Sequence, residues 1–293
     1  MRVTFNQVFR NGVADIHRAA EELTRRQREV SSLKRIQVPS DDPSASSAIV
    51  GERAEVRLVD QYVRATESVD SRLRVVDSVL TDIIKNIETT LVRASAGRNS
   101  FIDQTQRDAL ALDIEGLRDA ILTDVNQKYR DTYLFAGTRA TTSPFVKDAL
   151  GVVQAYAGNA DTMKVDIDAN RSIEVSIDGG AVVGSLFGDL DALAAAVRSG
   201  DIAAVATGMQ AMEAAFDRMV NAQSRVGNGL STLEEHKGRL GDIRRASEAR
   251  RASLEEANLA ESITKMQQAD TAHRAALGAV SGAARLSLLD YLR

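Results

Sequence analysis

The sequence predicts a mainly α-helical protein in which long coiled-coil-like helices from both chain ends pack together and a small β-rich insertion lies in the middle. Heptad spacing of apolar residues occurs near both ends of the 293-residue chain, and alternating spacing occurs in its middle. Aromatic residues make up 4% of the chain, which has three prolines and no tryptophan. This composition is typical of long helices, and the length has room for about two domains.

Both chain ends carry a seam of apolar or small residues spaced alternately four and three apart, the pattern that packs one helix along another. Near the end of the chain the seam consists of Leu259, Ile263, Met266, Leu277 and Val280, with Asp270 and His273 between them. Near the start it consists of Val13, Ile16, Ala20, Leu23 and Val30, with Gln27 between them. We predict that residues 1–40 and 255–293 pair as a terminal coiled coil. Two ordinary amphipathic helices in a bundle core are the alternative.

Leucines crowd into the last residues of the chain, at positions 286, 288, 289 and 292. A monomer gains little from large apolar side chains at a fraying chain end. We therefore expect Leu288 and Leu289 to make contacts only after assembly, and we group them with the two seams as the predicted assembly interface.

Long helices are also predicted between the two ends. The first helix should end near Val38, because Pro39 disfavours the helical conformation of the residue before it. Ser40-Asp41-Asp42-Pro43 is a start signal, with a side chain that caps free N–H groups and a proline at the first helical position. The next helix should run from about residue 44 to 96, with a seam of Val69, Leu73, Val76, Leu80, Ile83 and Ile87.

A third helix is expected from about residue 103 to 129, with one face formed by Leu110, Ile114, Leu117, Ile121 and Val125. Helical spacing returns after Gly188, and we interpret the row of Met209, Met212 and Met219 as core filling. Gly227-Asn228-Gly229 should break the chain before the closing helix. We predict that the helices of residues 41–138 and 190–254 together form one helical domain.

Residues 139–189 are predicted to form a β-rich surface insert. Short apolar runs at 145–146, 152–156, 163–167 and 173–177 are separated by turn residues, which is typical of small hairpins. The turns at Gly158-Asn159 and Asp178-Gly179-Gly180 favour a surface position, where deletion of residues 150–181 should be tolerated.

Composition and motifs argue against most functional classes. A net charge of −4 attracts neither nucleic acid nor an anionic membrane, and no apolar run approaches the roughly 18 residues of a membrane span. The first residues lack the apolar core of a secretory signal, and the absence of cysteine removes disulfides and thiol chemistry. His17, His236 and His273 should be surface or seam residues, and Asp166-Ile167-Asp168 lacks the later ligands of a calcium loop. We predict no catalytic, cofactor or metal site, and no enzyme.

Particular motifs resemble those of the flagellin superfamily, in which paired terminal helices enclose variable central domains. The stretch from Lys34 to Pro43 is similar to the superfamily signature GKRI-x-x-PSDDP, and residues 263–272 and 287–292 are similar to its C-terminus. The passage from Tyr133 to Thr138, followed by Pro144-Phe145, resembles the YLFAGT…PF passage of its hook-filament junction members. Leu33 stands where the superfamily often has glycine, and residues 150–187 match none of its passages.

The resemblance implies a flagellin-like fold and an axial structural protein of the bacterial flagellum, located outside the cell at the hook-filament junction. Such a protein would leave through the flagellar type III channel without a cleaved signal, and its ends would order on assembly. The implied partners are copies of itself in a ring or helix, the first hook-associated protein FlgK, flagellin and a flagellar export chaperone, with no nucleic acid and no membrane. A filament flagellin and a soluble coiled-coil sensor or chaperone are the alternative interpretations.

Overall fold

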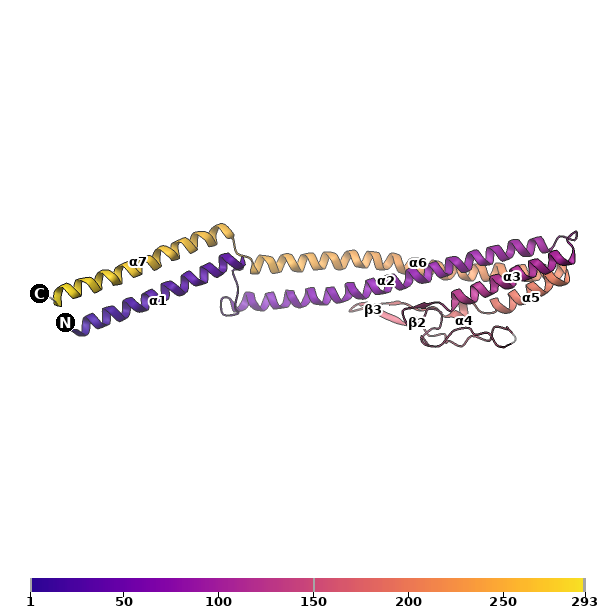
Figure 1. The fold of residues 1–293 in the computed structure, drawn as a ribbon, viewed down its shortest axis with the longest axis horizontal. Coiled ribbons are helices and arrows are strands. Elements are labelled where there is room, and N and C mark those ends of the chain that lie inside the picture. Colours follow the sequence, from indigo (N-terminus) through magenta and orange to yellow (C-terminus); the bar gives the residue numbers. More distant parts are fainter. Residues whose placement is uncertain (1, 150, 292–293) are drawn as a thin grey trace. The chain divides into compact units, whose positions relative to one another are not determined.

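The computed structural model describes residues 2–149 and 151–291, with the side chains of residues 7, 9–149 and 151–282. Its elements follow in the order α1 (Arg2–Ser32), α2 (Pro43–Gly97), α3 (Gln104–Val125), β1 (Lys128–Tyr129), β2 (Thr132–Tyr133), β3 (Lys164–Asp168), β4 (Arg171–Glu174), α4 (Gly179–Val182), α5 (Leu186–Ser199), α6 (Ile202–Glu255) and α7 (Leu259–Tyr291) (Figure 1). The predicted mainly helical fold is confirmed. The chain forms two units, here called the terminal unit (Met1–Val59 with Asp242–Arg293) and the central unit (Asp60–Gly241).

In the terminal unit, α1 and α7 lie side by side and run in opposite directions (Figure 1). Gly12, early in α1, lies against Val280, late in α7, whereas Ser262, early in α7, reaches Glu29, late in α1. A Cβ atom added at Gly12 would lie 2.6 Å from Cγ2 of Val280, so glycine allows this close approach. The predicted pairing of the two chain ends is confirmed.

The first helix ends at Ser32, and its predicted end near Val38 is wrong. Leu33 adopts a left-handed conformation with a φ of 56°. The chain then pairs with the segment between α6 and α7, where the Ala257 N–H donates to the Leu33 carbonyl at 3.0 Å. The helix ends because the residues that follow it contact a segment more than two hundred residues away in the sequence. A contact of this kind cannot be predicted from the local sequence.

The core of the central unit is organised around the seam of α2. Val69, Leu73, Val76, Leu80, Ile83 and Ile87 are between 0 and 4% exposed, as predicted. Side chains from α3, α5, α6 and the strand region join them in one buried cluster. Met212 and Met219 are fully buried in it, which confirms their interpretation as core residues.

Helix α6 runs without interruption through Gly227-Asn228-Gly229, so the predicted break there is wrong. A Cβ atom on Gly229 would lie 3.3 Å from Cδ1 of Leu73; the glycine therefore lets α2 and α6 approach closely. The chain breaks instead at residues 256–258, where the Ala260 N–H donates to Oδ1 of Asn258 at 3.1 Å and caps α7.

Two of the predicted β runs form the antiparallel hairpin of β3 and β4. The other two form no strand but lie together, with an isolated bridge between Lys147 and Val153 and a hydrogen bond from the Gln154 N–H to the Val146 carbonyl at 2.8 Å. The hairpin belongs to the core, because Ile167 and Val175 are buried in the same cluster as the α2 seam. Burial of this kind argues against a tolerated deletion of residues 150–181.

Two polar side chains fasten the hairpin to the helices of the central unit. Arg72 of α2 is buried and donates to the carbonyl oxygens of Val175 and Tyr133; burial lowers the pKa of Arg72. On α6, Nε2 of His236 lies 2.8 Å from the carbonyl oxygen of Ile167. Since a carbonyl oxygen only accepts, this nitrogen carries the proton.

The passage from Tyr133 to Thr138 is a core element. The three residues after Tyr133 are fully buried. Gly137 has a φ of 64°, and a Cβ atom there would lie 2.2 Å from the carbonyl oxygen of Asn159. Glycine alone satisfies both conditions, so this motif maintains the fold of the central unit.

The stretch Gly179–Ser199 is long and apolar enough, by length and composition, to cross a membrane, contrary to the prediction that no run approaches that size. Half of it is buried inside the protein, and Leu186, Leu190 and Val197 are fully buried in the central core. Packing within this core accounts for its apolar character.

We predict that Leu33→Gly stabilises the terminal unit by about 0.5–1 kcal/mol, because glycine adopts a positive φ without the steric penalty of a Cβ atom. Leu33 is 51% exposed, so little packing is lost. Leu33→Ala keeps the Cβ atom and should give no gain. Thermal unfolding followed by circular dichroism compares the variants, and an unchanged melting temperature in Leu33→Gly would contradict this account of the turn.

Candidate assembly interface

Helix α1 presents the seam that the sequence predicts. Its half-buried apolar residues are Val13, Ile16, Ala20, Leu23 and Val30, and α7 is the helix packed against them. Charged residues between them pair along the helix, as Arg26 does with Glu22 at 2.8 Å. Because burial of the seam is only partial, the pair of helices leaves some of its apolar surface in contact with solvent.

Helix α7 packs on α1 in a register that the sequence did not predict. The buried side carries Ser262 and Ala269, with Met266, His273, Ala276 and Val280 half-buried on the same track. The exposed fractions of Leu259, Ile263 and Leu277 are 47%, 36% and 46%. The prediction that these three residues pair with α1 is wrong, whereas Met266 and Val280 lie where predicted.

Two heptad tracks compete on α7, because they share positions 266, 273 and 280 and differ elsewhere by one residue. Large apolar side chains mark one track in the sequence, but the structure buries the track that carries serine and alanine. Small side chains allow α1 to approach, and Ser262 Oγ donates to Oε1 of Glu29 at 2.9 Å. The close fit of small side chains against α1 and this hydrogen bond determine the register of α7. Neither feature can be seen in the hydrophobic periodicity of the sequence.

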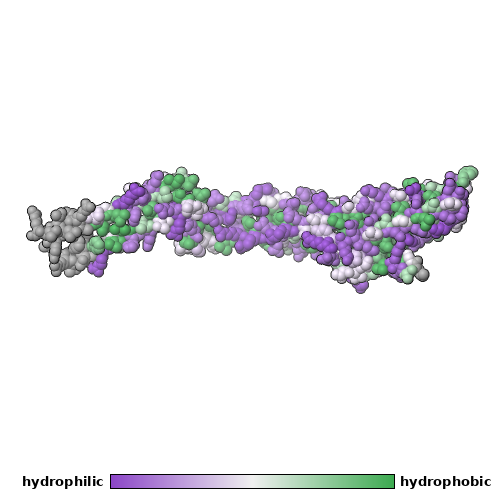
Figure 2. All heavy atoms as spheres, in the orientation of Figure 1, coloured by the Kyte–Doolittle hydropathy of each residue, from purple (hydrophilic) through white to green (hydrophobic). Residues whose placement is uncertain are grey.

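The other track of α7 is not buried against α1. Its exposed apolar residues are Leu259, Ile263 and Leu277, here called the outer strip. Figure 2 shows hydrophobic residues gathered on the terminal unit around the beginning of α7. Leu259 and Ile263 lie one helical turn apart, whereas Leu277 lies farther along α7, beyond Asp270 on the same track. Exposed apolar residues of this kind are typical of a protein–protein contact, so these residues stay predicted assembly contacts. Leu288 and Leu289 belong to α7, but their side chains lie outside the described residues.

A buried carboxylate holds the end of α6 in the terminal unit. Glu255 is 5% exposed, and its Oε1 lies 2.6 Å from Lys34 Nζ and 2.8 Å from Arg53 Nη2. Burial raises the pKa of Glu255, but the hydrogen bond from Lys34 and the charge of Arg53 outweigh it and leave the pKa below its ordinary value. The Arg35 N–H also donates to the Glu255 carbonyl at 2.8 Å. Glu255 thus joins α6 both to α2 and to the loop after α1.

The two aspartates before Pro43 have separate roles. Oδ2 of Asp41 accepts from the backbone N–H groups of Gln37 at 3.0 Å and Val38 at 3.1 Å, and these bonds lower the pKa of Asp41. Oδ1 of Asp42 accepts from the Ala45 N–H at 3.0 Å and caps α2. The predicted helix start is confirmed, and the preceding loop is closed by the first aspartate.

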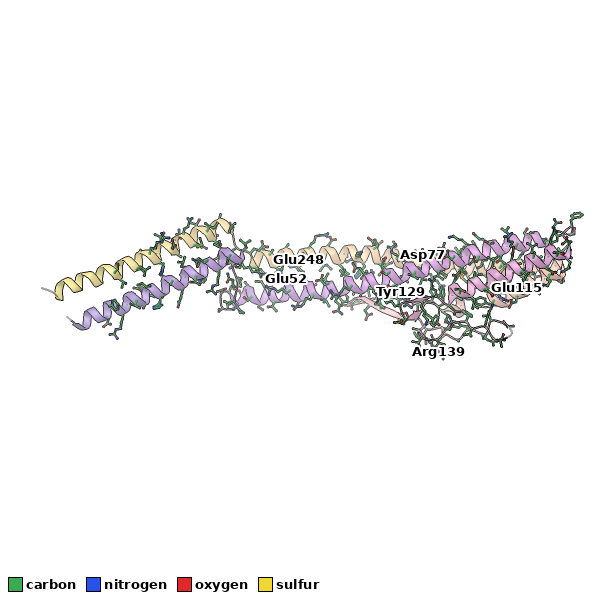
Figure 3. All side chains as sticks on the ribbon, viewed as in Figure 1. Glu52, Asp77, Glu115, Tyr129, Arg139 and Glu248 are labelled. Atoms are coloured by element: carbon green, nitrogen blue, oxygen red, sulfur yellow. The ribbon has the colours of Figure 1, made fainter. Side chains whose placement is uncertain are left out.

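An ion pair joins α2 to α6 in the terminal unit. Nε and Nη2 of Arg250 donate to the two carboxylate oxygens of Glu52 at 2.7 and 3.0 Å. Figure 3 labels Glu52 on α2 and Glu248 on α6, and Glu248 pairs with Arg244 of its own helix at 3.1 Å. The two-point contact to Glu52 fixes orientation as well as distance.

Among the residues that the structure describes, no three His, Asp or Glu side chains are grouped so as to hold a metal ion. His17 is exposed on α1, and His273 is half-buried on the side of α7 that faces α1. His236, which was predicted to be a surface or seam residue, is instead 1% exposed in the central unit. Its contact with β3 is long-range, so spacing along the chain gave no signal for it.

Comparison with known proteins extends these findings. Residues 4–140 match the bacterial flagellin N-terminal helical region. The matched residues include α2, α3, the loop with Asp41 and Asp42, and the passage from Tyr133 to Thr138. The resemblance to the flagellin superfamily is therefore confirmed.

Two curated relatives share more than the flagellin N-terminal region. Flagellar hook-associated protein 3 of Escherichia coli (strain K12) is 30% identical over 195 residues, which are 64% of this chain and 58% of that protein. The protein of the same name from Salmonella typhimurium is 25% identical over 188 residues, with the same coverage of 64% and 58%. The chain thus spans less than two thirds of the length of either relative.

Solved structures share the fold. A putative flagellar hook-associated protein from Vibrio parahaemolyticus matches with a TM-score of 0.69 at 19% identity, over 74% of this chain and 100% of that chain. FlgL from Bacillus cereus matches with a TM-score of 0.60 at 19% identity, over 70% and 99%. The flagellar junction protein FlgL from Legionella pneumophila matches with a TM-score of 0.61 at 13% identity, over 71% and 100%. The flagellin-like fold class is confirmed.

We predict that Glu255→Gln lowers the free energy of unfolding of the terminal unit by about 1–2 kcal/mol, because it removes the charged acceptor of two cations. The side chains of Lys34 and Arg53 are half-exposed, so solvent screens their charges. The loss in the free energy of unfolding should therefore be smaller than for a fully buried ion pair. The neighbouring Glu256 is exposed, so Glu256→Gln should change stability by less than about 0.5 kcal/mol. Urea unfolding followed by circular dichroism measures both, and equal effects would contradict the assigned role of Glu255.

Acid should loosen the loop that Asp41 closes. The pKa of Asp41 is lower in the folded protein than its ordinary value of about 4, so its contribution is complete above about pH 4 and is lost as pH falls through the folded value. Amide exchange at Gln37 and Val38 should therefore accelerate below about pH 4, after correction for the intrinsic exchange rate. Asp41→Ala, which has no side-chain acceptor, should show fast exchange at neutral pH already; protection equal to that of the native chain would refute the assignment.

Proposed function

We propose that this chain is a structural subunit of the bacterial flagellum, an adaptor at the hook-filament junction that links the first hook-associated protein FlgK to the flagellin filament. The observation that carries the proposal is the 30% identity over 195 residues with flagellar hook-associated protein 3 of Escherichia coli. The chain acts outside the cell after export through the flagellar channel. Its partners are further copies of itself, FlgK, flagellin and an export chaperone.

The terminal unit supports this proposal through its incomplete burial. The seam of α1 is only half-buried, and the outer strip of α7 is exposed along the helix. A subunit that packs sideways against copies of itself covers such surfaces, and each subunit of a ring repeats the gain of about 25 cal/mol per Å² of apolar area. The predicted assembly interface therefore consists of the two seams, the outer strip, Leu288 and Leu289.

We infer that the chain is not an enzyme, and the contacts of three buried polar side chains support this inference. Arg72 and His236 bind main-chain carbonyl oxygens of the hairpin region, and Glu255 binds two cations. A filament flagellin would carry the same N-terminal region, so location within the flagellum distinguishes the two functions. The passage from Tyr133 to Thr138 favours the junction protein.

The outer strip provides the test. In cells that produce Ile263→Glu/Leu277→Glu in place of the native chain, we expect hooks without filaments and monomeric flagellin in the medium, because unpaired charges in an apolar contact prevent its formation. The free variant should keep its helix content and melting temperature, since both side chains are exposed in the monomer. Electron microscopy of cells and fractionation of the medium give the readout.

The matched control is Gln268→Glu/Thr271→Glu, which adds the same charge at exposed polar positions of α7 and should leave filaments normal. Immunogold labelling of the native chain should mark one point at the base of each filament. Labelling along whole filaments would identify the chain as a flagellin instead. Filaments of normal length in Ile263→Glu/Leu277→Glu would show that the outer strip is not an assembly contact.

A further inference from the structure

The central unit contains a groove of about 570 Å³ between the strand β4 and the helix α6. The strand side is formed by Ser172, Glu174 and Ser176, and the helix side includes Ala222, Arg225 and Val226. All of these residues lie in the central unit. None of them has a role in the proposed assembly interface, so the groove calls for a separate explanation.

The strand that lines the groove has one unpaired edge. Among the described strands, β4 pairs with β3 alone. The Val175 N–H donates to the Met163 carbonyl at 2.8 Å, and Val165 lies opposite Ile173. Main-chain groups of an antiparallel strand point alternately to its two sides. The groups of Ser172 and Glu174 therefore point away from β3, to the side of β4 that has no neighbouring strand.

The opposite wall offers apolar contact and one positive charge. Val226, Ala222 and Leu73 are between 3 and 7% exposed and form an apolar floor. Arg225 is exposed, and no carboxylate is paired with it in the described part of the chain. The acidic groups at the groove are already engaged: Glu174 lies 3.6 Å from Lys164.

The second acidic group, Asp178, accepts hydrogen bonds from the Gly180 and Ala181 N–H groups at 2.9 and 3.2 Å. Asp178 keeps its negative charge in these hydrogen bonds, whereas Arg225 is the charged side chain of the groove that has no partner among the described residues. An occupant that complements the groove is therefore acidic at the point where it meets Arg225 and apolar over the floor.

We propose that this groove binds an extended peptide segment of a partner protein, which adds to the free edge of β4 as a further strand. A strand edge faced by a helix is a known arrangement for strand addition, in which main-chain hydrogen bonds give affinity and alternate side chains give specificity. A strand residue occupies about 160 Å³ at ordinary rise and spacing. The groove therefore holds about three or four residues, one of them acidic and an alternate one apolar.

The probe is a short fluorescent peptide of alternating valine and threonine with one central aspartate, and a second peptide has lysine in place of aspartate. Fluorescence anisotropy with the full chain should show saturable binding of the first peptide, about tenfold weaker binding of the second, and a reversed preference in Arg225→Glu. The amide resonances of Ser172 and Glu174 should shift on binding.

Glu174→Pro removes the outward N–H group and is compatible with an edge strand, so it should abolish binding, whereas Glu174→Ala keeps that N–H group and should bind normally. A peptide methylated at alternate backbone nitrogens should also fail, and this measurement leaves the protein unchanged. Absence of saturable binding below about 1 mM, or equal binding of the methylated peptide, would overturn the proposal. So would concentration-dependent dimerisation that Glu174→Pro abolishes, because a second copy would then fill the groove.

Discussion

Each long helix of this protein must cover its apolar stripe along its whole length, and the partners available to each stretch decide how firmly it is held. In the central unit the seam of α2 shares its core with α3, α5, α6 and the strand region, and Leu80 and Ile83 are fully buried. In the terminal unit α1 packs on α7, and its seam reaches only partial burial. The same heptad spacing thus produces a fully buried core in the central unit and a partly exposed apolar seam in the terminal unit.

In the terminal unit, where the apolar seam of α1 is only partly buried, charged side chains determine where the helices begin and end. Glu29 is 8% exposed and binds Arg26 at 2.7 Å and Ser262 at 2.9 Å, close to the point where α1 ends. Glu255 performs the same task for α6. Compared with apolar residues, a buried ion pair adds little net stability, but removing one partner of the pair is costly, so the pair tolerates few alternative positions. These contacts therefore set where each helix begins and ends more than how strongly the helices associate.

Features that depend on local physics were predictable from the sequence. The seam of α2, the cap at Asp42 and the buried methionines follow from spacing and from residue type alone. Contacts between distant segments were not predictable: the turn at Leu33 exists because Ala257 pairs with it. The register of α7 was also missed, because alanine and serine carry a weak hydrophobic signal although they fit best against a neighbouring helix. In the candidate interface, position on α1 was therefore predicted well, and position on α7 only in part.

The uninterrupted path of α6 through Gly227 and Gly229 gives this helix an uneven stiffness. Each glycine in a helix interior is about 1 kcal/mol less favourable than alanine, because its backbone has more conformations to visit. Val226 and Leu233, on either side, are anchored by burial in the core. If α6 is bent or twisted, the backbone should deform first at this short stretch. The helix is therefore stiff over most of its length and more flexible at the two glycines.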